Sequence, residues 1–299
     1  MAKQLKGEGI SQDTLIEYLD TKSDFQFELK ILKMMKDHGL PCEHGGHYVD
    51  PVTKLSREFD IRCRVAAGRY RLQLAVECKN LQRNFPLLVS AVQRSENECY
   101  HDAAIITHPT LWVKWGAARS NYMNVQRARF MRVGGASSHY RVGGTVGKTT
   151  AQVGISTSKE IVSGDSGIYE KWGQCLSSLD ELVAEMDDMP LLPSDHWLAA
   201  VALPILVVPD GVLWRTVYDE GGTRSEDPKP VNRVSIYAGK DYSLGPLHLG
   251  HLTVSHVEIM TESGLDQFIR ENLTSATALA QTFFEDVNPE SYMNQQPAG

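Results

Sequence analysis

Apolar residues recur every three or four positions in two stretches of the chain, which is the spacing of one helix face. The first stretch covers residues 24–38 and is followed by Gly39 and Pro41, which are typical of a helix end. The second covers residues 168–186, and its apolar stripe consists of Ile168, Trp172, Cys175, Leu179, Leu182, Val183 and Met186. We expect a third helix over residues 86–100.

Strict alternation of apolar and polar residues predicts two neighbouring strands, at 57–65 and 70–79. Residues 66–69 contain a glycine and are expected to form the turn of a hairpin between them. Residues 134–166 are rich in Gly, Ser and Thr and are expected to be mostly loop. Further strands are expected at 47–49, 103–107, 198–208, 212–218, 234–237 and 252–260.

Helices and strands are mixed along the whole chain, which is typical of an α/β fold. No internal repeat and no linker separates the elements, so we expect one domain over residues 24–275 with a β-rich C-terminal elaboration. An extension over residues 1–23 precedes this domain, and a tail over residues 276–299 follows it.

Composition places the chain among ordinary globular proteins, since 42% of its 299 residues are hydrophobic and 22% are charged. Its five cysteines form no CxxC pair and are odd in number, which argues against a disulfide framework and favours a reducing, cytoplasmic setting. The longest apolar run, Trp197–Val208, is well short of the roughly 20 residues of a membrane span. The N-terminus lacks the apolar segment of a secretory signal.

Charge is distributed unevenly along the chain, although the total is only −7. Residues 57–148 contain 15 Lys or Arg and 6 Asp or Glu, a net charge of +9, which leaves −16 for the remainder. This asymmetry indicates a basic surface for a polyanion such as nucleic acid. The alternative is that the arginine-rich strand faces are merely exposed to solvent.

The predicted hairpin collects acidic residues on its polar face. With a turn at 66–69, Asp60 is expected opposite Ala75 and diagonal to Glu77, at a backbone separation of roughly 7–8 Å. Lys79 lies two positions after Glu77 and therefore points the same way. A slip of one residue in the register would move Glu77 and Lys79 to the opposite face.

Two carboxylates beside a lysine suit metal-dependent phosphodiester hydrolysis. Carboxylate oxygens are hard ligands that suit Mg²⁺, which keeps several waters and also binds phosphate oxygens. The metal lowers the pKa of a bound water and stabilises the charge that develops at phosphorus. A nearby lysine can orient that water, accept its proton or hold the phosphate. The alternative is a salt-bridge patch on a solvated sheet.

The predicted order of helix, strand, hairpin, helix and strand, with Asp60 and Glu77-Cys78-Lys79 on the hairpin, resembles the PD-(D/E)xK, or restriction-endonuclease-like, nuclease superfamily over residues 24–108. The resemblance implies an αβββαβ core with a mixed central sheet flanked by helices. It also implies that Asp60, Glu77 and the carbonyl of Cys78 hold Mg²⁺, for which Mn²⁺ can substitute, and that Lys79 acts on the water.

Other features of this family are matched less closely. Glu28 on the first helix stands where many members place a further acidic metal ligand. Phe59 precedes Asp60 where the motif has a proline, which leaves the subfamily open. Because enzymes that cut both strands of a duplex often pair two sites, the resemblance is compatible with a homodimer.

Residues outside the hairpin are candidates for contacts with nucleic acid. Gln93 and Arg94, on the expected third helix, could approach the scissile phosphate. Lys148, Thr149 and Gln152, in the expected loop, carry ammonium, hydroxyl and amide groups of the kind that bind the backbone.

We therefore expect a metal-dependent nuclease that acts on DNA. One alternative is a module of the same fold that binds nucleic acid without cleaving it. Another is a nucleotide-binding interaction protein that uses residues 143–150. Those residues resemble a phosphate loop, but only three residues separate Gly143 from Gly147, where a Walker A motif has four.

Overall fold

The structure is a computed structural model that describes residues 7, 9–107, 112–114, 122–124, 127–164, 166–186, 197–243, 251–285 and 287. Its helices are α1 (Gln12–Thr21), α2 (Phe25–Asp37), α3 (Ser166–Ala184), α4 (Glu262–Asn272) and α5 (Ala276–Phe283). Its strands are β1 (Cys42–Val49), β2 (Ser56–Ala67), β3 (Tyr70–Cys78), β4 (Leu87–Gln93), β5 (Tyr100–Thr107), β6 (Trp112–Lys114), β7 (Tyr122–Asn124), β8 (Arg127–Gly134), β9 (Thr145–Ile155), β10 (Ile161–Gly164), β11 (Trp197–Val208), β12 (Leu213–Tyr218), β13 (Arg224–Pro230), β14 (Arg233–Ser243) and β15 (His251–Thr261).

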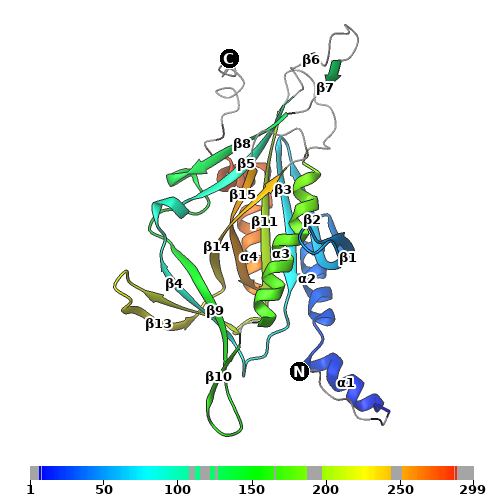
Figure 1. Cartoon of the computed structure of the whole chain (residues 1–299), viewed down its shortest axis with the longest axis vertical. Helices are drawn as coiled ribbons and strands as arrows, with labels where there is room; N and C mark the ends of the chain where they lie inside the picture. The colour runs from blue at the N-terminus through cyan, green and yellow to red at the C-terminus, as the bar shows by residue number, and fades with distance from the viewer. Residues whose placement is uncertain are drawn as a thin grey trace.

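One large mixed sheet forms the body of the protein, as Figure 1 shows. Its strand order is β1-β2-β3-β11-β15-β14-β9-β4-β12-β13, with β5, β8 and β10 attached beside this path. β1, β2 and β3 form an antiparallel meander, whereas β11 runs parallel to β3 and β15 runs parallel to β11. The chain is therefore an α/β protein with a mixed sheet.

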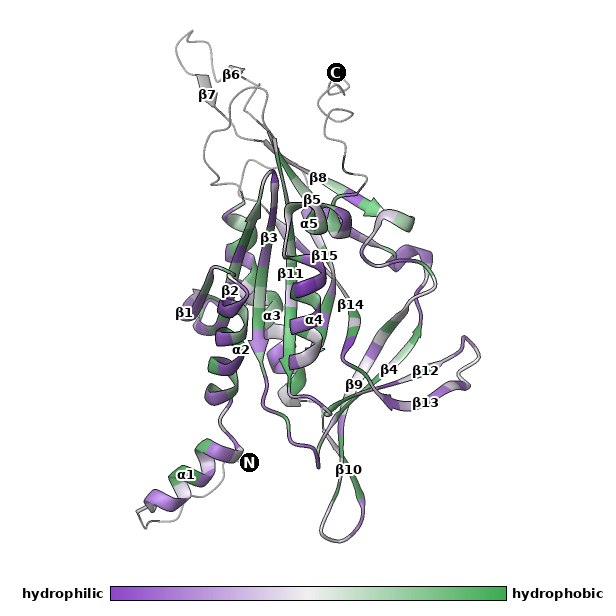
Figure 2. Cartoon of the chain, turned by 180° about the vertical axis from the view of Figure 1, so that it is seen from behind, coloured by the Kyte–Doolittle hydropathy of each residue, from purple (hydrophilic) through white to green (hydrophobic). Residues whose placement is uncertain are grey.

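Helices cover both faces of the sheet (Figures 1 and 2). α2, α4 and α5 pack on one face through Ile31, Phe268 and Phe283, which share a core cluster with Val76 of β3. α3 packs on the other face, where its apolar stripe meets Ala75. Because successive residues of a strand point to opposite faces, β3 is buried on both sides. Within the described residues, no helix has the length and apolar character needed to cross a bilayer.

The helix expected over 86–100 is wrong. Residues 87–93 form β4, which is followed by a single 3₁₀ turn, Glu96–Glu98. β4 pairs with β9 on one side and with β12 on the other, so its backbone is satisfied within the sheet. Leu87, Val89 and Ala91 are buried at every second position, which is the period of a strand.

The loop expected over 134–166 is wrong from residue 145 to residue 164, where β9 and β10 form an antiparallel ribbon. The glycines that favoured a loop have a packing role here. A Cβ on Gly147 would lie 2.7 Å from Val89 Cγ1 and 2.9 Å from Ile236 Cγ1. Only glycine allows β9 to approach its neighbours this closely.

The two ends of the described chain differ in how they pack. α1, in the expected N-terminal extension, has no buried residue. α5, in the expected tail over 276–299, contributes Leu279 and Phe283 to the core at 0% and 1% exposure. The domain therefore extends past residue 275, and residues 288–299 lie outside the described part of the chain.

A buried polar network lies between β14, β15 and the 3₁₀ turn Gly135–Ser137. Glu258 is fully buried and accepts two hydrogen bonds from Arg233, at 2.8 and 2.9 Å. Burial opposes ionisation of Glu258, but the guanidinium outweighs this effect and lowers the pKa of the carboxyl. His256 stacks on Tyr140 at 3.7 Å, and burial together with the charge of Arg94 lowers the pKa of His256 to about 3.

We predict that the free energy of unfolding falls as the pH is lowered below about 6.5, the pKa of an unfolded histidine. In this range unfolded His256 binds a proton, whereas folded His256 stays neutral down to about pH 3. The contribution of this one histidine approaches about 1.4 kcal/mol per pH unit. Urea unfolding between pH 7 and pH 5 should show a shallower slope for His256→Gln than for the wild type. His47→Gln, at an exposed histidine, should keep the wild-type slope, and equal slopes for all three proteins would contradict the prediction.

Candidate active site

The β2–β3 hairpin has a tighter turn than the sequence suggested. Ala67 pairs with Tyr70 across a two-residue turn in which Gly68 has a φ of +58°. Ala75 therefore lies opposite Arg62 and not opposite Asp60, so the expected register is wrong by two residues. A shift of two residues keeps every side chain on its face, and it moves Asp60 toward direct opposition with Glu77.

Asp60 and Glu77 lie together on the sheet face that α3 covers. Continuing the register from the Ile61–Val76 pair places the two carboxylates on facing positions. The backbone N–H of Cys78 donates to Asp60 Oδ2 at 2.7 Å, which fixes that carboxylate against β3. Asp60 is 8% exposed and Glu77 is 0% exposed, so both carboxylates are almost fully removed from solvent.

The cation between these carboxylates is Lys171 of α3, a residue that the sequence analysis did not select. Its Nζ donates to Asp60 Oδ1 and Oδ2 at 3.2 and 3.0 Å and to Glu77 Oε2 at 3.1 Å. A signal for it existed, because Lys171 lies four positions before Cys175 and so interrupts the apolar stripe of the predicted helix. A lysine on the buried stripe of a helix calls for a buried acidic partner.

Lys79 does not join the acid pair, although the alternation along β3 indicated that it would. Its Nζ donates instead to Asp24 Oδ2 at 2.7 Å, and Asp24 Oδ1 accepts from the N–H of Asn80 at 2.8 Å. Lys79 follows the last residue of β3, where the backbone leaves the sheet. These contacts attach the start of α2 to the end of β3.

Glu28 lies on the first turn of α2, near His44 of β1, with a separation of 3.7 Å between Oε2 and Nε2. Burial, with a further contribution from the Asp60 charge, raises the pKa of Glu28 to about 7. Because Asp60 and Lys171 both act on this group, Glu28 belongs to the same electrostatic cluster as the acid pair.

Burial and the Asp60 carboxylate raise the pKa of Glu77 to about 8, against the opposing effect of the Lys171 ammonium. Burial also disfavours the charged form of Lys171, but Glu77 and Asp60 outweigh this effect and raise its pKa. One oxygen, Glu77 Oε1, is buried without a hydrogen-bond partner among the described residues. This cluster is therefore acidic and desolvated, and one of its buried carboxylate oxygens accepts no hydrogen bond from the described residues.

The donor chemistry of the cluster fits a hard divalent cation. Mg²⁺ is commonly held by one or two carboxylates, with waters and phosphate oxygens as its remaining ligands. Asp60 and Glu77 supply those carboxylates, and the orphaned Oε1 of Glu77 is a free acceptor. Among the described residues, no group of three or more His, Cys, Asp or Glu side chains is arranged to hold a metal ion.

The candidate nucleic-acid contacts are divided between different places. Arg94 is 8% exposed and donates to Thr145 O and Ser235 Oγ, which is the environment of a structural arginine. Gln93 and Lys148 line a cavity of about 870 Å³, and Lys148 is ion-paired with Glu98. Exposed Thr149 lies on β9 opposite Ser90, and Gln152 lines a separate cavity of about 400 Å³ that Lys79 also lines.

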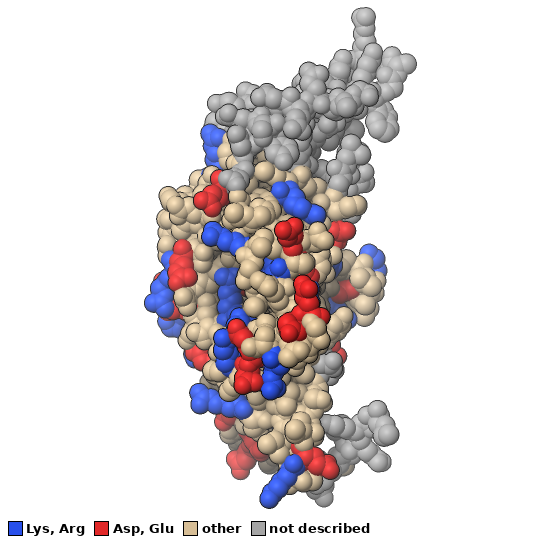
Figure 3. All heavy atoms as spheres, turned by 90° about the vertical axis from the view of Figure 1, so that its left-hand side faces the viewer, with Lys and Arg blue, Asp and Glu red and all other residues tan. Residues whose placement is uncertain are grey.

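The expected basic surface is largely compensated by acidic partners. Arg62 pairs with Glu181 of α3, and Arg64 pairs with Glu185, which directly follows α3. Arg132 pairs with Asp102. On the face shown in Figure 3, lysines and arginines are interspersed with aspartates and glutamates. Part of the positive charge of residues 57–148 is therefore neutralised by ion pairs within the protein.

The phosphate-loop alternative loses its structural basis. Most of residues 143–150 belong to β9, which continues to Ile155 and is followed by the strand β10, so no helix begins directly after these glycines. A phosphate loop needs a helix N-terminus directly after its glycines. Comparison with known proteins found no matching family model, curated protein or solved structure.

We predict that Lys171→Met lowers the free energy of unfolding by about 3–5 kcal/mol in metal-free buffer, because two buried carboxylates lose their cation. Adding Glu77→Gln to this variant should recover part of the loss. Urea unfolding of the single and double variants measures both effects. Lys33→Met is the matched control, since this lysine is 76% exposed and its ion pair contributes at most about 1 kcal/mol. Equal losses for Lys171→Met and Lys33→Met would contradict the prediction.

Proposed function

We propose that the protein is a metal-dependent nuclease that hydrolyses phosphodiester bonds, with DNA as its substrate. The observation that carries the proposal is the convergence of Asp60 and Glu77, from adjacent strands, on one ammonium group. Ionisable groups with strongly perturbed pKa values and a specific charge partner are more common at functional sites than elsewhere. Glu77 and Glu28 both have this property.

The order of elements around the acid pair supports the same proposal. α2, β1, β2, β3, α3 and β11 follow one another in the order αβββαβ, with β11 parallel to β3 and α3 as the crossover helix. This is the order of a restriction-endonuclease-like core, in which β4 to β10 would be an insertion between β3 and α3. The second helix of the core would then be α3 and not the segment 86–100.

Each residue of the cluster has a role in this proposal. Asp60 and Glu77, with Glu28 and the carbonyl of Cys78 as further ligands, would hold Mg²⁺ or Mn²⁺. Such an ion polarises the phosphate and lowers the pKa of its water when it is bound. Lys171 opposes the effect of burial on Glu77, and its ammonium, which lies beside the acid pair, would orient the attacking water or hold a phosphate oxygen once the metal ion is bound.

One alternative function has an observation in its favour. Lys171 contacts three carboxylate oxygens, which is also the pattern of a permanent structural ion cluster. In that case the protein would bind nucleic acid without cleaving it. The two functions differ in whether Asp60 and Glu77 bind a divalent ion.

We predict that purified protein nicks plasmid DNA in Mg²⁺ or Mn²⁺ and that Asp60→Asn or Glu77→Gln lowers the rate by at least about a hundredfold. Both changes keep the side-chain shape, so unfolding curves should stay cooperative. Titration of Mn²⁺, followed by its electron paramagnetic resonance signal, should show weaker binding for both variants. Full cleavage by either variant would rule out this site, and Mn²⁺ binding equal to the wild type would favour the structural ion cluster.

The two lysines should behave differently in the same assay. Lys171→Met should lower the cleavage rate by about a hundredfold, since its ammonium contacts the acid pair. Lys79→Met should have the smaller effect on cleavage, because its ammonium contacts Asp24. The reverse order would return the catalytic role to Lys79, as the family resemblance first implied.

A further inference from the structure

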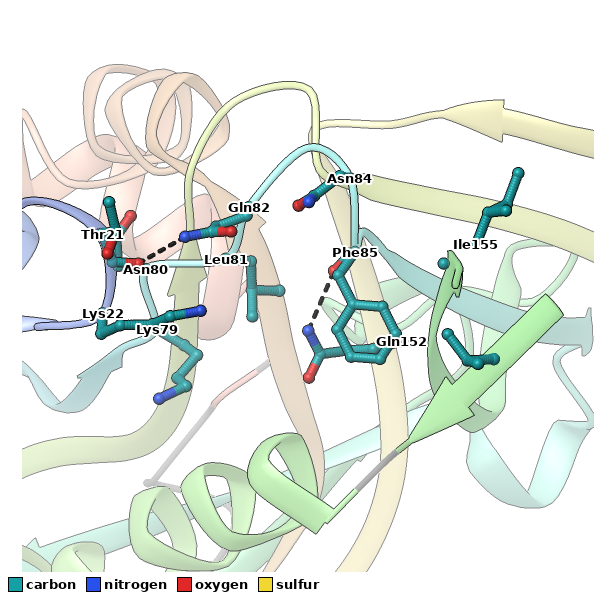
Figure 4. Close-up of a pocket in the computed structure, with 12 residues that line it drawn as sticks. Thr21, Lys22, Lys79, Asn80, Leu81, Gln82, Asn84, Phe85, Gln152 and Ile155 are labelled. Carbon is teal, nitrogen blue, oxygen red and sulfur yellow. Dashed lines mark hydrogen bonds between the residues drawn. The ribbon is translucent and has the colours of Figure 1, made fainter. Parts of the chain in front are cut away.

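A cavity of about 400 Å³ opens where the chain leaves the end of β3 (Figure 4). Three segments that are distant in the sequence line it: residues 21–22 at the end of α1, residues 79–85 between β3 and β4, and the β9–β10 ribbon. In Figure 4 Thr21, Lys22, Lys79 and Asn80 stand on one side, and Gln152 and Ile155 stand on the other. Its volume lies within the range of about 300–1,000 Å³ that is typical of small-ligand sites.

One side of the cavity carries positive charge. Lys79 is 28% exposed and commits one contact to Asp24, so two of its three protons remain for a ligand. Lys22 is exposed and forms no ion pair within the described part of the chain. Two ammonium groups at one end of a cavity are a site for a phosphate.

The remaining lining offers amides and one aromatic ring. Asn80, Gln82, Asn84 and Gln152 supply side-chain amides, which donate and accept hydrogen bonds. Two of these amides are held in place, because Gln82 Nε2 donates to Thr21 O at 2.6 Å and Gln152 Nε2 donates to Phe85 O at 3.0 Å.

The ring of Phe85 is fixed by a glycine on the facing strand. A Cβ on Gly154 would lie 2.7 Å from Phe85 Cδ2 and 3.0 Å from the carbonyl oxygen of Asn84. The absence of a side chain at this position lets the ring settle against β9. The phenyl group is therefore a preformed surface on one wall of the cavity.

The cavity is close to the chemistry of the proposed function. Lys79, the first residue after β3, lines it and follows Glu77 of the acid pair by two positions in the chain. A ligand held by Lys79 would therefore lie at the end of β3 that carries Glu77.

We propose that this cavity binds one unpaired nucleotide of the substrate strand, directly adjacent to the phosphodiester bond at Asp60 and Glu77. The inference rests on the proposed nuclease function and adds the substrate class, which is single-stranded nucleic acid or a strand with an unpaired nucleotide at the cut. Lys22 and Lys79 hold the phosphate, Phe85 stacks on the base, and the amides of Asn84 and Gln152 contact the base edge. A base is open to stacking and to edge contacts together only when it is unpaired.

The test uses the full-length protein in EDTA, so that binding is measured without cleavage. The probe is a short single-stranded oligonucleotide that carries 2-aminopurine, whose fluorescence falls when the base stacks on an aromatic ring. We expect quenching with the wild type, and a tenfold weaker affinity with loss of quenching for Phe85→Leu. Gly154→Ala should act in the same direction, because its methyl group displaces the ring.

Lys22→Ala provides a second variant at an exposed position where folding is not at risk. It should weaken binding and reduce the salt dependence by about one phosphate contact. Lys229→Ala, on the edge strand β13 and outside the cavity lining, is the charge-matched control and should bind like the wild type. Thermal unfolding of every variant separates lost binding from lost structure.

Each outcome decides the inference. Binding of the oligonucleotide by folded Phe85→Leu and Lys22→Ala within twofold of the wild type overturns it, whether or not the protein cleaves DNA. Equal losses for Lys22→Ala and Lys229→Ala also overturn it. Equal affinity for a free mononucleotide and for the oligonucleotide would show that the cavity binds a mononucleotide and not a nucleic-acid strand, which also overturns the inference. If the variants lose binding as expected but the wild type does not cut the same oligonucleotide in Mg²⁺ or Mn²⁺, the cavity stands and the nuclease function fails.

Discussion

Two buried carboxylates require a nearby cation, and this requirement organises the centre of the protein. Asp60 and Glu77 lie on adjacent strands and have almost no access to solvent. An uncompensated charge in such a place is strongly disfavoured. Lys171 meets the requirement from α3, so the contact that neutralises the acids also holds the helix layer on the sheet.

The same cluster is an inefficient way to build a stable core. Well-packed apolar residues in place of a buried ion cluster are often equally stable or more stable. Glu77 also retains one buried oxygen without a partner, which adds a further cost to the folded state. Unfavourable features of this kind are expected where a site performs chemistry, and they are the reason that we favour catalysis over a structural role.

The segment between β3 and α3 shapes the surroundings of the acid pair. β3 and β11 are parallel neighbours, yet the chain builds β4 to β10 before it returns through α3. This segment supplies Phe85, Gln152 and Gly154 to the cavity beside Lys79. β2 and β3 carry the two acids, and the segment between β3 and α3 supplies groups that lie near the end of β3.

Local patterns along the sequence correctly predicted α2 and α3, and they placed Asp60 and Glu77 on one face. The face was correct even though the register was wrong by two residues, because alternation along a strand has a period of two. The pattern failed at β4 and β9, where pairing with distant strands overrode a helical or loop preference. Gly147 is an example: it suggested a loop in the sequence, but in β9 its lack of a side chain allows Val89 and Ile236 to pack closely against the strand.

Spacing between near neighbours in the chain fixes which side of a helix or strand a residue occupies, since backbone geometry sets that direction. The choice of partner across the molecule follows different physics. Lys79 was the nearest lysine in sequence, but the chain leaves the sheet there and its ammonium meets Asp24. Lys171 reaches Glu77 because packing of α3 buries one face of that helix against β3, and a contact between such distant residues is not encoded in any local pattern.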